Sequence, residues 1–473
     1  MSYVVAIDQG TSGTKAIVVS AAGEVLASAE ESIRPRYLPD GGVEQDPMEM
    51  LDSVLSTARR AVADAGVPIA AMALANQGET VLAWDRATGT PLTPAVVWQD
   101  RRSEGLCRDL AAYADMIAGR TGLVLDSYFS APKMAWIRRH LTTDGVVTTT
   151  DTWLAHQLCG EFVTDVSTAS RSLLLDLDAV AWDAELQAIF GLEGEPLPDL
   201  VDSDAIVGET SVLGYPVPLT GLIVDQQAAL LAQSCVEPGT AKCTFGTGAF
   251  LLAQTGKMAA RSTVGLTTSV AWGLRGDRRY CIDGQVYTAA SAVRWLTDMG
   301  LISGAADLDA AAAADTDGVM CVPALAGLAA PWWRSEATAT LTGLSLSTGP
   351  GQVVRAVIDG IAAQVATLVD AVGNDIGRPL TMLQVDGGLT RSRVLMQAQA
   401  DLAQVPVQVY PSPHATALGA AVCGHLALDP GLTIVEAIGE WNPVARYEPI
   451  WSADRAEDYL ARWRQVVEAG LAT

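Results

Sequence analysis

Two short stretches rich in glycine, serine and threonine have the composition of phosphate-binding turns. The first spans residues 8–14 and precedes Lys15, and the second spans residues 244–248 in the other half of the chain. Glycine lets the backbone turn sharply and present its N–H groups to a ligand, and hydroxyl side chains add further donors. Taken alone, the first stretch is better explained as an ordinary hairpin turn, because turns rich in Gly, Ser and Thr are common. Because there are two, we predict that they face each other and bind a polyphosphate from both sides, with Asp8 holding Mg²⁺ directly or through water.

Asp225 is the side chain best placed to act as a general base. It follows a short apolar strand that ends near the junction of the two halves. None of the four histidines lies in a candidate ligand-binding motif, so a carboxylate is the simpler proton acceptor. The alternative is structural, because an aspartate here can also cap the N-terminus of the helix expected over residues 226–231.

Three further side chains have the chemistry of a pocket for a hydroxylated compound. Glu79 and Tyr128 can fix neighbouring hydroxyl groups by hydrogen bonds, and Trp98 can form an apolar wall against a carbon chain. Ordinary structural roles remain open for all three. A glutamate after a strand is usually solvated, and tyrosine or tryptophan side chains often serve only packing.

Strands in the first half are expected to position these residues. Apolar runs at residues 3–7, 15–20 and 25–28 predict a meander around a turn at residues 8–13. A further buried strand over residues 72–75 ends just before Gly78 and Glu79. The candidate residues therefore follow strand ends.

A helix is predicted between these strands. Asp46 has the type of an N-cap residue, Pro47 suits the first helical position, and Glu49 lies three residues after the cap. Apolar residues then keep helical spacing until Gly66, which favours a helix end there. The alternation of strands and helices places the chain in the α/β class.

The second half repeats the pattern of the first. We call the two glycine-rich turns the first tip (residues 8–14) and the second tip (residues 244–248). Strands are expected at residues 240–245 and 249–254, on either side of the turn of the second tip, and a further strand at residues 382–385 runs into two glycines. Residues 417–428, rich in small side chains, predict a tightly packed helix. The exit from the first half is expected at residues 216–225.

Composition limits the classes of protein that this chain can belong to. Its 473 residues suit two large domains, and 49% hydrophobic against 18% charged residues supply two cores. The formal net charge is −24 and no Lys/Arg cluster occurs, which argues against nucleic acid and anionic membranes as partners. Seven cysteines without a CxxC pair indicate free thiols in a reducing compartment. No segment approaches the ~20 apolar residues of a membrane span, so we expect a cytoplasmic protein.

Longer motifs resemble the FGGY family of carbohydrate kinases. Residues 128–140 and residues 339–359 match two extended signatures of that family, and the similarity runs from Asp8 to about Asp429. Within the family the chain is most similar to the glycerol kinases. That similarity rests on six short motifs in the expected order: residues 8–11, 42–47, 97–99, 151–154, 225–229 and 246–248.

The resemblance implies a fold, a reaction and a set of site residues. The fold would consist of two actin-like, ribonuclease-H-like domains, with residues 1–225 mainly binding the acceptor and residues 226–473 mainly binding ATP, around an interdomain cleft. The reaction would be ATP- and Mg²⁺-dependent phosphorylation of a hydroxyl of a small polyol or sugar, with Asp225 as the base. The residues implied for acceptor binding are Gly78, Glu79, Trp98, Tyr128, Asp225 and Gln226. Those implied for nucleotide binding are Thr11, Ser12, Gly13, Lys15, Thr247, Gly248, Ala290, Arg294, Gly387, Gly388 and Ser392.

Four positions depart from the glycerol kinase pattern. Gly78 stands where those enzymes usually carry an arginine that donates to substrate hydroxyls, so we expect an enlarged pocket and a longer acceptor, such as a polyol or ketose of four or five carbons. Ala290, Arg294 and Ser392 replace the usual glycine, glutamine and asparagine around the adenine, so ATP remains the expected donor with altered affinity.

Other activities remain open on the sequence alone. A non-catalytic actin-like scaffold or sugar sensor would share the fold, and a chaperone-type ATPase would share the phosphate tips without needing an acceptor pocket. We expect the chain to form a homo-oligomer, either a dimer or a tetramer.

Overall fold

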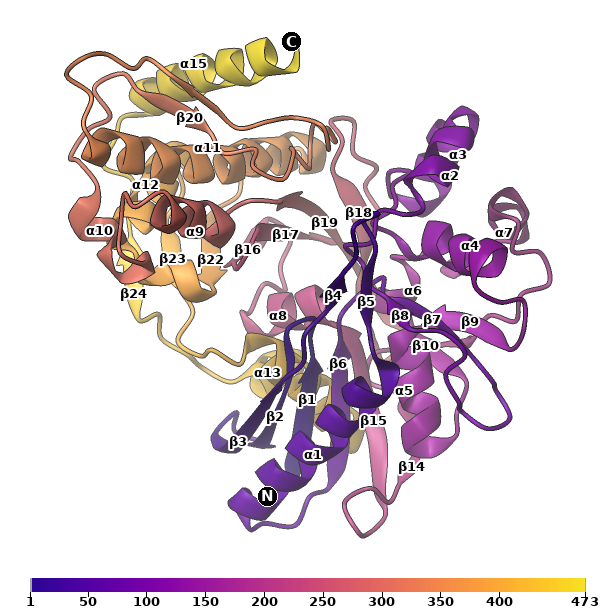
Figure 1. Cartoon of the computed structure of the whole chain (residues 1–473). Coiled ribbons are helices and arrows are strands. Elements are labelled where there is room, and N and C mark those ends of the chain that lie inside the picture. Colours follow the sequence, from indigo (N-terminus) through magenta and orange to yellow (C-terminus); the bar gives the residue numbers. More distant parts are fainter. Residues whose placement is uncertain (1, 473) are drawn as a thin grey trace.

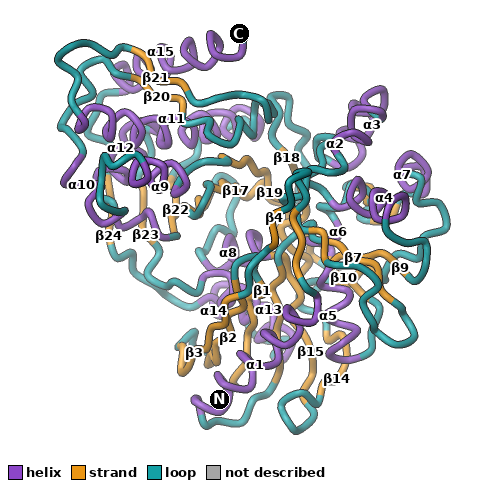
Figure 2. The backbone as a smooth tube through the Cα atoms, in the orientation of Figure 1, coloured by secondary structure: helices purple, strands orange, loops and turns teal. Residues whose placement is uncertain are grey.

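A computed structural model describes residues 2–472 of the chain. Figure 1 shows two lobes, one built mainly by the indigo-to-magenta first half and the other by the orange-to-yellow second half. In Figure 2 the strands of each lobe lie inside a layer of helices. The chain is therefore an α/β protein with two central sheets, as the alternating pattern predicts.

The first lobe is organised around a six-stranded sheet. Its strands in spatial order are β14 (Ile206–Thr210), β15 (Val217–Val224), β6 (Ala71–Asn76), β1 (Tyr3–Gln9), β2 (Gly13–Ser20) and β3 (Val25–Ser32). β1, β2 and β3 form an antiparallel meander, whereas β6 pairs parallel to β1 and β15 pairs parallel to β6. Parallel neighbours end at the same edge of a sheet, which brings their following loops together.

The second lobe repeats this strand order in a seven-stranded sheet. Its strands are β18 (Thr267–Leu274), β19 (Asp277–Val286), β17 (Ala249–Gly256), β16 (Thr240–Phe245), β22 (Met382–Asp386), β23 (Val407–Val409) and β24 (Ala445–Tyr447). β16, β17 and β19 are antiparallel, and β22 and β23 follow parallel to β16. The duplicated topology agrees with the expected pair of actin-like, ribonuclease-H-like domains.

Smaller sheets and helices complete the two lobes. A five-stranded sheet in the first lobe has the order β4 (Arg36–Tyr37), β5 (Val43–Gln45), β8 (Ala95–Val96), β7 (Val81–Trp84) and β9 (Val146–Thr149). The two-stranded sheets are β10 (Val163–Asp165) with β13 (Asp199–Val201), β11 (Leu175–Asp176) with β12 (Ala181–Trp182), and β20 (Met320–Val322) with β21 (Thr340–Thr342). The helices are α1 (Pro47–Ala65), α2 (Glu104–Asp109), α3 (Ala114–Thr121), α4 (Ser130–His140), α5 (Thr150–Cys159), α6 (Val166–Ala169), α7 (Ala184–Phe190), α8 (Asp225–Ala232), α9 (Ala290–Asp298), α10 (Leu308–Ala311), α11 (Pro350–Ile376), α12 (Arg393–Ala403), α13 (Ala415–Leu428), α14 (Ile434–Ile438) and α15 (Ala453–Leu471).

Helix α1 begins and ends at the residues predicted from its capping signals. The Asp46 carboxylate accepts a hydrogen bond from the Met48 N–H at 2.8 Å, and Pro47 occupies the first helical position. Gly66 ends the helix with a φ of 62°, which an L side chain adopts only at a cost. The local signals were therefore sufficient for this element.

The turn predicted at residues 8–13 is shorter in the structure. β1 continues through Asp8 to Gln9, and the connection to β2 covers only residues 10–12. The reason is pairing on both sides, because Asp8 lies opposite Lys15 in β2 and Ala75 in β6. The expected turn at Asp8 was wrong, and the carboxylate lies on the last part of a central strand.

Helices α8 and α13 cover the face of the first sheet that is turned toward the second lobe. Small side chains on that face, such as Ala6 and Ala73, form one hydrophobic cluster with residues of both helices and with Leu252 and Trp272 of the second sheet. A side chain at Gly419 of α13 would overlap the backbone carbonyl of Ala228 in α8. The predicted tightly packed helix is thus confirmed, and it packs on the first sheet although it lies in the second half of the sequence. The boundary at residue 225 stays a prediction.

Helix α11 contradicts one expectation from the sequence. Among the described residues it is the one helix that is long and apolar enough to cross a membrane, whereas no such segment was expected. In the structure 83% of its apolar window is buried, so α11 serves as a core helix of the second lobe.

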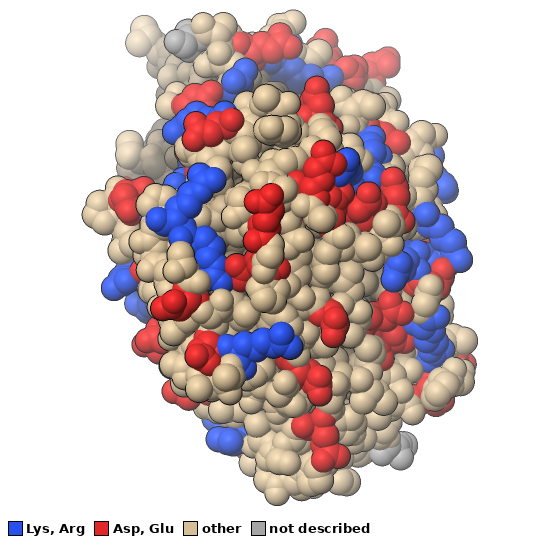
Figure 3. Space-filling model, turned by 90° about the vertical axis from the view of Figure 1, so that its right-hand side faces the viewer, with Lys and Arg blue, Asp and Glu red and all other residues tan. Residues whose placement is uncertain are grey.

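All seven cysteines are free thiols. On the face drawn in Figure 3, basic and acidic side chains are interspersed without a continuous basic patch.

Candidate active site

Four predicted site residues lie at or just after neighbouring strand ends of the first sheet. β1, β6 and β15 are parallel, with Gln9 and Val224 both paired to Asn76. Asp8 therefore lies at the end of β1, Gly78 and Glu79 follow β6, and Asp225 follows β15. This adjacency is what the predicted site requires of the first lobe.

Asp8 lies close enough to Asp225 for the charge of that carboxylate to affect the pKa of Asp8. Burial and then the Asp225 charge raise the pKa of Asp8 to about 7, which Lys15 partly opposes. Burial also raises the pKa of Asp225, against the charge of Lys242 and a 2.6 Å hydrogen bond from the Gln226 N–H. Two facing carboxylates disfavour double ionisation unless a cation lies between them.

The carboxylate pair suits a magnesium ion that is shared with a substrate. No group of three or more His, Cys, Asp or Glu side chains in residues 2–472 forms a complete metal site. Mg²⁺ in nucleotide sites is usually held by one or two carboxylates, substrate phosphates and waters. Asp8 with Asp225 matches that partial donor set.

The first tip presents unpartnered backbone donors. The Gly10 N–H donates to the Gly13 carbonyl at 3.0 Å and closes the turn, while the N–H groups of Thr11 and Ser12 make no hydrogen bond to any described residue. The Thr11 hydroxyl is engaged, donating to Gln77 Oε1 at 3.1 Å and accepting from Trp98 Nε1 at 2.9 Å. The tip thus offers backbone groups to a phosphate, and the Thr11 side chain connects it to the acceptor side.

The second tip is held against two neighbouring segments. Gly246 and Thr247 accept hydrogen bonds from the N–H groups of Ala290 and Ala289 at 3.0 and 2.9 Å, at the start of α9. Gly387, with a φ of 96°, lies so close to the Phe245 carbonyl that a side chain there would overlap it. Since Thr244 and Asp386 are paired in register, the tip and the turn at Gly387 and Gly388 lie side by side.

The residues expected around the adenine lie further along α9 and α12. Ala290 begins α9, and Arg294, one turn later, is exposed. Ser392 caps α12, accepting from the Leu395 N–H at 3.1 Å and donating to Asp309 at 2.5 Å. The Ser392 hydroxyl already has two partners, and its nucleotide contact stays a prediction.

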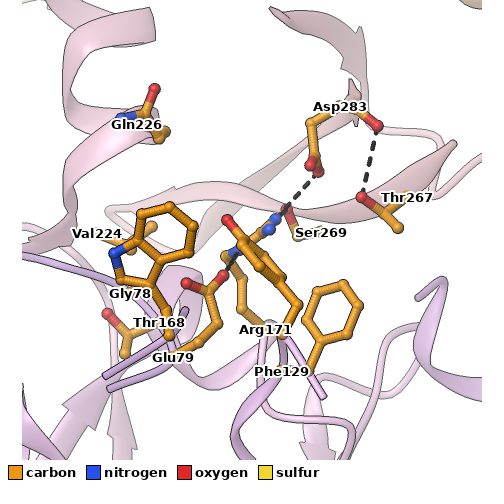
Figure 4. A network of polar contacts seen from close by, with 12 residues as sticks. Gly78, Glu79, Phe129, Thr168, Arg171, Val224, Gln226, Thr267, Ser269 and Asp283 are labelled. Atoms are coloured by element: carbon orange, nitrogen blue, oxygen red, sulfur yellow. Dashed lines mark hydrogen bonds and ion pairs between the residues drawn. The ribbon is translucent and has the colours of Figure 1, made fainter. Parts of the chain in front are cut away.

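The acceptor side contains a buried ion-pair chain (Figure 4). Glu79 is 3% exposed and forms an ion pair with Arg171, whose guanidinium also contacts Asp283 of β19 at 3.0 Å. Tyr128 lies beside this chain, with Arg171 Cζ 5.7 Å from the centre of its ring, and its ring packs edge-on against Trp98 at 5.5 Å. Burial and the nearby Glu79 carboxylate raise the pKa of Tyr128, so its hydroxyl keeps its proton.

The space beside Gly78 is smaller than expected from the sequence. A β-carbon at residue 78 would lie 2.9 Å from Cγ2 of Val224. The Val224 methyl group therefore fills part of the volume that a missing arginine side chain was expected to leave. The neighbour of residue 78 on this side is thus an apolar side chain.

Two cations of the site were missed in the sequence. Lys242 lies fully buried in β16 and donates to Gln226 Oε1 at 2.5 Å and to Thr244 Oγ1 at 2.9 Å, joining the helix of Asp225 to the strand of the second tip. A lysine within an otherwise apolar strand was a signal that could have found it. Arg171 belongs to no recognised motif, and only the fold shows its partners.

Comparisons with known proteins agree with this architecture. The FGGY family of carbohydrate kinases matches over residues 3–232 for its N-terminal domain and residues 241–428 for its C-terminal domain. Glycerol kinase of Aromatoleum aromaticum is 41% identical over 488 residues, covering 99% of this chain and 98% of that protein, and glycerol kinase of Bordetella parapertussis is also 41% identical, with 98% and 96% coverage. The crystal structure of Plasmodium falciparum glycerol kinase with ADP superposes with a TM-score of 0.92 at 31% identity, covering 100% of this chain and 98% of that one.

Family membership over both domains also decides between the activities left open by the sequence. A glycine-rich turn in each lobe, carboxylates at the first sheet edge and a buried cluster of polar side chains beside them are consistent with the parts that a phosphotransferase needs. The chain belongs to the FGGY family of carbohydrate kinases and transfers a phosphoryl group from ATP to a hydroxyl group of a polyol or sugar.

Proposed function

We propose that the acceptor is a neutral polyol or ketose of four or five carbons, phosphorylated on a primary hydroxyl. The observation that carries this proposal is that residue 78 is a glycine with Val224 as its neighbour, so a cationic donor to acceptor hydroxyls is missing there and the nearest side chain is apolar. An additional carbon of the acceptor can contact Val224 and Trp98, whereas a hydroxyl there would lose a hydrogen bond. Glycerol, the substrate named for the relatives, would leave that apolar surface uncovered.

The balance of charges around the site favours a neutral acceptor. Asp8, Glu79, Asp225 and Asp283 contribute four carboxylates, and the cations that oppose them are Arg171, Lys242, Lys15 and Lys133. A carboxylate on the acceptor would add a further negative charge to a buried site whose cations are already balanced. We therefore expect aldonates to be poor substrates.

The roles of the individual residues follow from their positions. Asp225 accepts the proton of the attacking hydroxyl, while Glu79, Tyr128 and Gln226 bind the other acceptor hydroxyls. Because Gln226 Oε1 accepts from Lys242, its amide nitrogen is left to donate to the acceptor.

The nucleotide would be bound by residues of both lobes. Asp8 would hold Mg²⁺, which neutralises charge on the transferred phosphoryl group. The residues proposed to contact ATP are Thr11, Ser12, Gly13, Lys15, Thr247, Gly248, Gly387 and Gly388 at the phosphates, and Ala290, Arg294 and Ser392 toward the adenine.

An acceptor panel tests the proposed substrate class. ADP release from ATP and Mg²⁺ is followed with glycerol, erythritol, threitol, D-ribulose, D-xylulose and gluconate, and kcat/KM is compared. We expect a four- or five-carbon neutral compound to exceed glycerol by at least ~10-fold, the value of about one well-packed methylene. A clear preference for glycerol would refute the chain length, and a preference for gluconate would refute the neutral class.

The cellular setting and the oligomeric state are separate parts of the proposal. We infer a soluble cytoplasmic enzyme, because its donor ATP is a cytoplasmic metabolite. A homo-oligomer remains our expectation, and sedimentation equilibrium of the full chain distinguishes monomer, dimer and tetramer.

A further inference from the structure

Arg171 occupies a central position that neither the motifs nor the proposed reaction explains. It lies two residues after α6 and is 5% exposed. Its Nε donates to Glu79 Oε1, while Nη1 donates to Asp283 at 3.0 Å and lies 3.5 Å from the Ser269 hydroxyl. Figure 4 shows the guanidinium between the Glu79 and Asp283 carboxylates. A single side chain thus joins the acceptor pocket to two strands of the second sheet.

The buried carboxylate of Glu79 is stabilised by its ion pair with Arg171. Its backbone is in the left-handed region, with a φ of 56°, and its carboxylate is buried, two features that are each unfavourable for glutamate. Burial raises the pKa of Glu79, and the charge and hydrogen bond of Arg171 oppose that rise. Glu79 Oε1 is engaged by Arg171, whereas Oε2 makes no hydrogen bond to any residue between 2 and 472. The free oxygen is the one available to an acceptor hydroxyl.

Asp283, at the other end of the Glu79–Arg171–Asp283 ion-pair network, lies in a part of the second sheet that is held against the first lobe. β18 packs on α6, and the Val270 N–H donates to the Ser170 hydroxyl at 2.9 Å. The Thr268 N–H donates to the Gly122 carbonyl at 2.7 Å, a second contact between the lobes. Asp283, on the neighbouring strand β19, is therefore fixed relative to the first lobe, and it can orient the guanidinium.

We infer that Arg171 is a positioning residue for the acceptor: it holds Glu79 Oε1 so that Oε2 is presented to an acceptor hydroxyl, with Asp283 orienting the guanidinium. The inference rests on the proposed role of Glu79 in acceptor binding and adds the group that makes this carboxylate usable. It also identifies the cation whose charge and hydrogen bond oppose the rise in the pKa of Glu79 in a pocket that has Gly78 in place of an arginine.

Four variants separate positioning from a structural role. Arg171→Met removes the charge at similar volume, Arg171→Lys keeps the charge without the planar fork, and Asp283→Asn weakens only the distal arm. Arg138→Met is the matched control, because Arg138 forms an equally direct, largely buried pair with Glu195 at 2.6 Å and contacts no proposed site residue. Each full-length variant is assayed for kcat and for the KM values of ATP and of the best acceptor in the panel.

We expect Arg171→Met to raise the acceptor KM by ~10–100-fold, the value of a lost hydrogen bond to a charged group, and the ATP KM by less than ~3-fold. Arg171→Lys should recover part of the loss, and Asp283→Asn should raise the acceptor KM by a smaller factor. Arg138→Met should lower thermal stability with both KM values unchanged.

Equal acceptor KM values in Arg171→Met and Arg138→Met would overturn the inference. If Arg171→Met fails to fold, Asp283→Asn decides, and an unchanged acceptor KM in that variant would overturn it as well. Absence of turnover by the unmodified enzyme with every acceptor would instead refute the proposed substrate class, so the two failures are distinguishable.

Discussion

Three carboxylates follow strand ends within one site, and each has a different electrostatic environment. Asp8 faces Asp225, with Lys15 as its counter-charge; Asp225 is balanced by Lys242; and Glu79 is paired directly with Arg171. A paired carboxylate stays ionised and accepts hydrogen bonds, whereas one facing a like charge binds a proton or a cation. The residue types are similar, and their different neighbours suit the separate roles that we propose for them in acceptor binding, proton transfer and metal binding.

The pH dependence of Mg²⁺ binding should report Asp8. Its pKa of about 7 means that Asp8 takes up a proton as the pH falls through neutrality, and the protonated acid cannot bind a cation. At limiting Mg²⁺, activity should therefore decrease as the pH is lowered below about 7. A tenfold increase in Mg²⁺ should shift the midpoint of this decrease to a lower pH by up to ~1 unit. The groups facing Asp8 are Asp225, Lys15 and Glu30.

Asp8→Asn is the control for this titration. The terminal phosphate of ATP itself titrates near pH ~6–7, and that contribution persists in the variant. In Asp8→Asn the Mg²⁺-dependent displacement of the pH profile should shrink to the part that comes from ATP. An undiminished displacement would remove Asp8 as the metal-binding carboxylate.

Replacement of Asp225 tests the proposed base. Asparagine keeps the shape and the hydrogen bond to the start of α8 but cannot accept the hydroxyl proton. We expect Asp225→Asn to lower kcat by ~10²–10⁴-fold while acceptor and ADP binding, measured by calorimetry, change by less than ~10-fold. Near-normal turnover would exclude Asp225 as the base.

Single residues were predictable where a local motif marked them. Asp8, Glu79 and Asp225 follow apolar runs, which placed them at strand ends without a structure. Arg171 was not predictable, because its importance comes from Glu79 and Asp283, which lie 92 and 112 residues away in sequence. The effect of Gly78 was predicted only in part, since the neighbour that narrows the pocket, Val224, comes from another strand.

At the scale of elements, the crossing of α8 and α13 positions the proposed base. Asp225 is the first residue of α8, and α8 packs on α13 at Gly419, where no β-carbon fits beside the Ala228 carbonyl. Helix backbones approach this closely only when one of them carries glycine. The position of Asp225 therefore depends on a residue nearly two hundred positions later in the chain.

Gly419→Ala should damage both stability and turnover. The added methyl group must separate α8 from α13, which we expect to cost ~1–3 kcal/mol in the free energy of unfolding and to lower kcat in the folded enzyme. Gly119→Ala is the control, because Gly119 lies inside α3 and a β-carbon added there would have no atom within 4 Å, so alanine should stabilise the helix slightly. Urea denaturation and steady-state assays check both. Equal behaviour of the two variants would show that the helices can move apart freely.

The sequence predicted the ends of a helix or strand correctly where those ends depend on contacts between residues close in sequence. α1 begins at the predicted cap and ends at Gly66, since capping is a contact between near neighbours in sequence. β1 runs past its predicted end because β6, a distant segment, pairs with it. α11 has the composition of a membrane helix, and only its burial by the rest of the second lobe identifies it as a core helix.

In the whole molecule, the two repeated sheets share a hydrophobic cluster. Val4 and Ile223 of the first sheet pack with α8 and α13, and the cluster continues to Leu252 and Trp272 of the second sheet. Arg171 and Lys242 add polar bridges beside this apolar contact. We therefore expect that domain closure, which would exclude water from phosphoryl transfer, bends the molecule about this shared core.

A shared core predicts cooperative unfolding of the two lobes. Scanning calorimetry of the full chain should show one transition, because neither sheet can expose its share of the cluster without the other. ADP should raise the Tm, and the acceptor added with ADP should raise it by more than the sum of the separate shifts, since one ligand on each side favours the closed arrangement. Single ligands at about 100 times their Kd each contribute ~2.7 kcal/mol, so the excess is measurable. Two separate transitions, of which only one responds to ADP, would show that the lobes unfold independently and that ligand binding to one lobe does not stabilise the other.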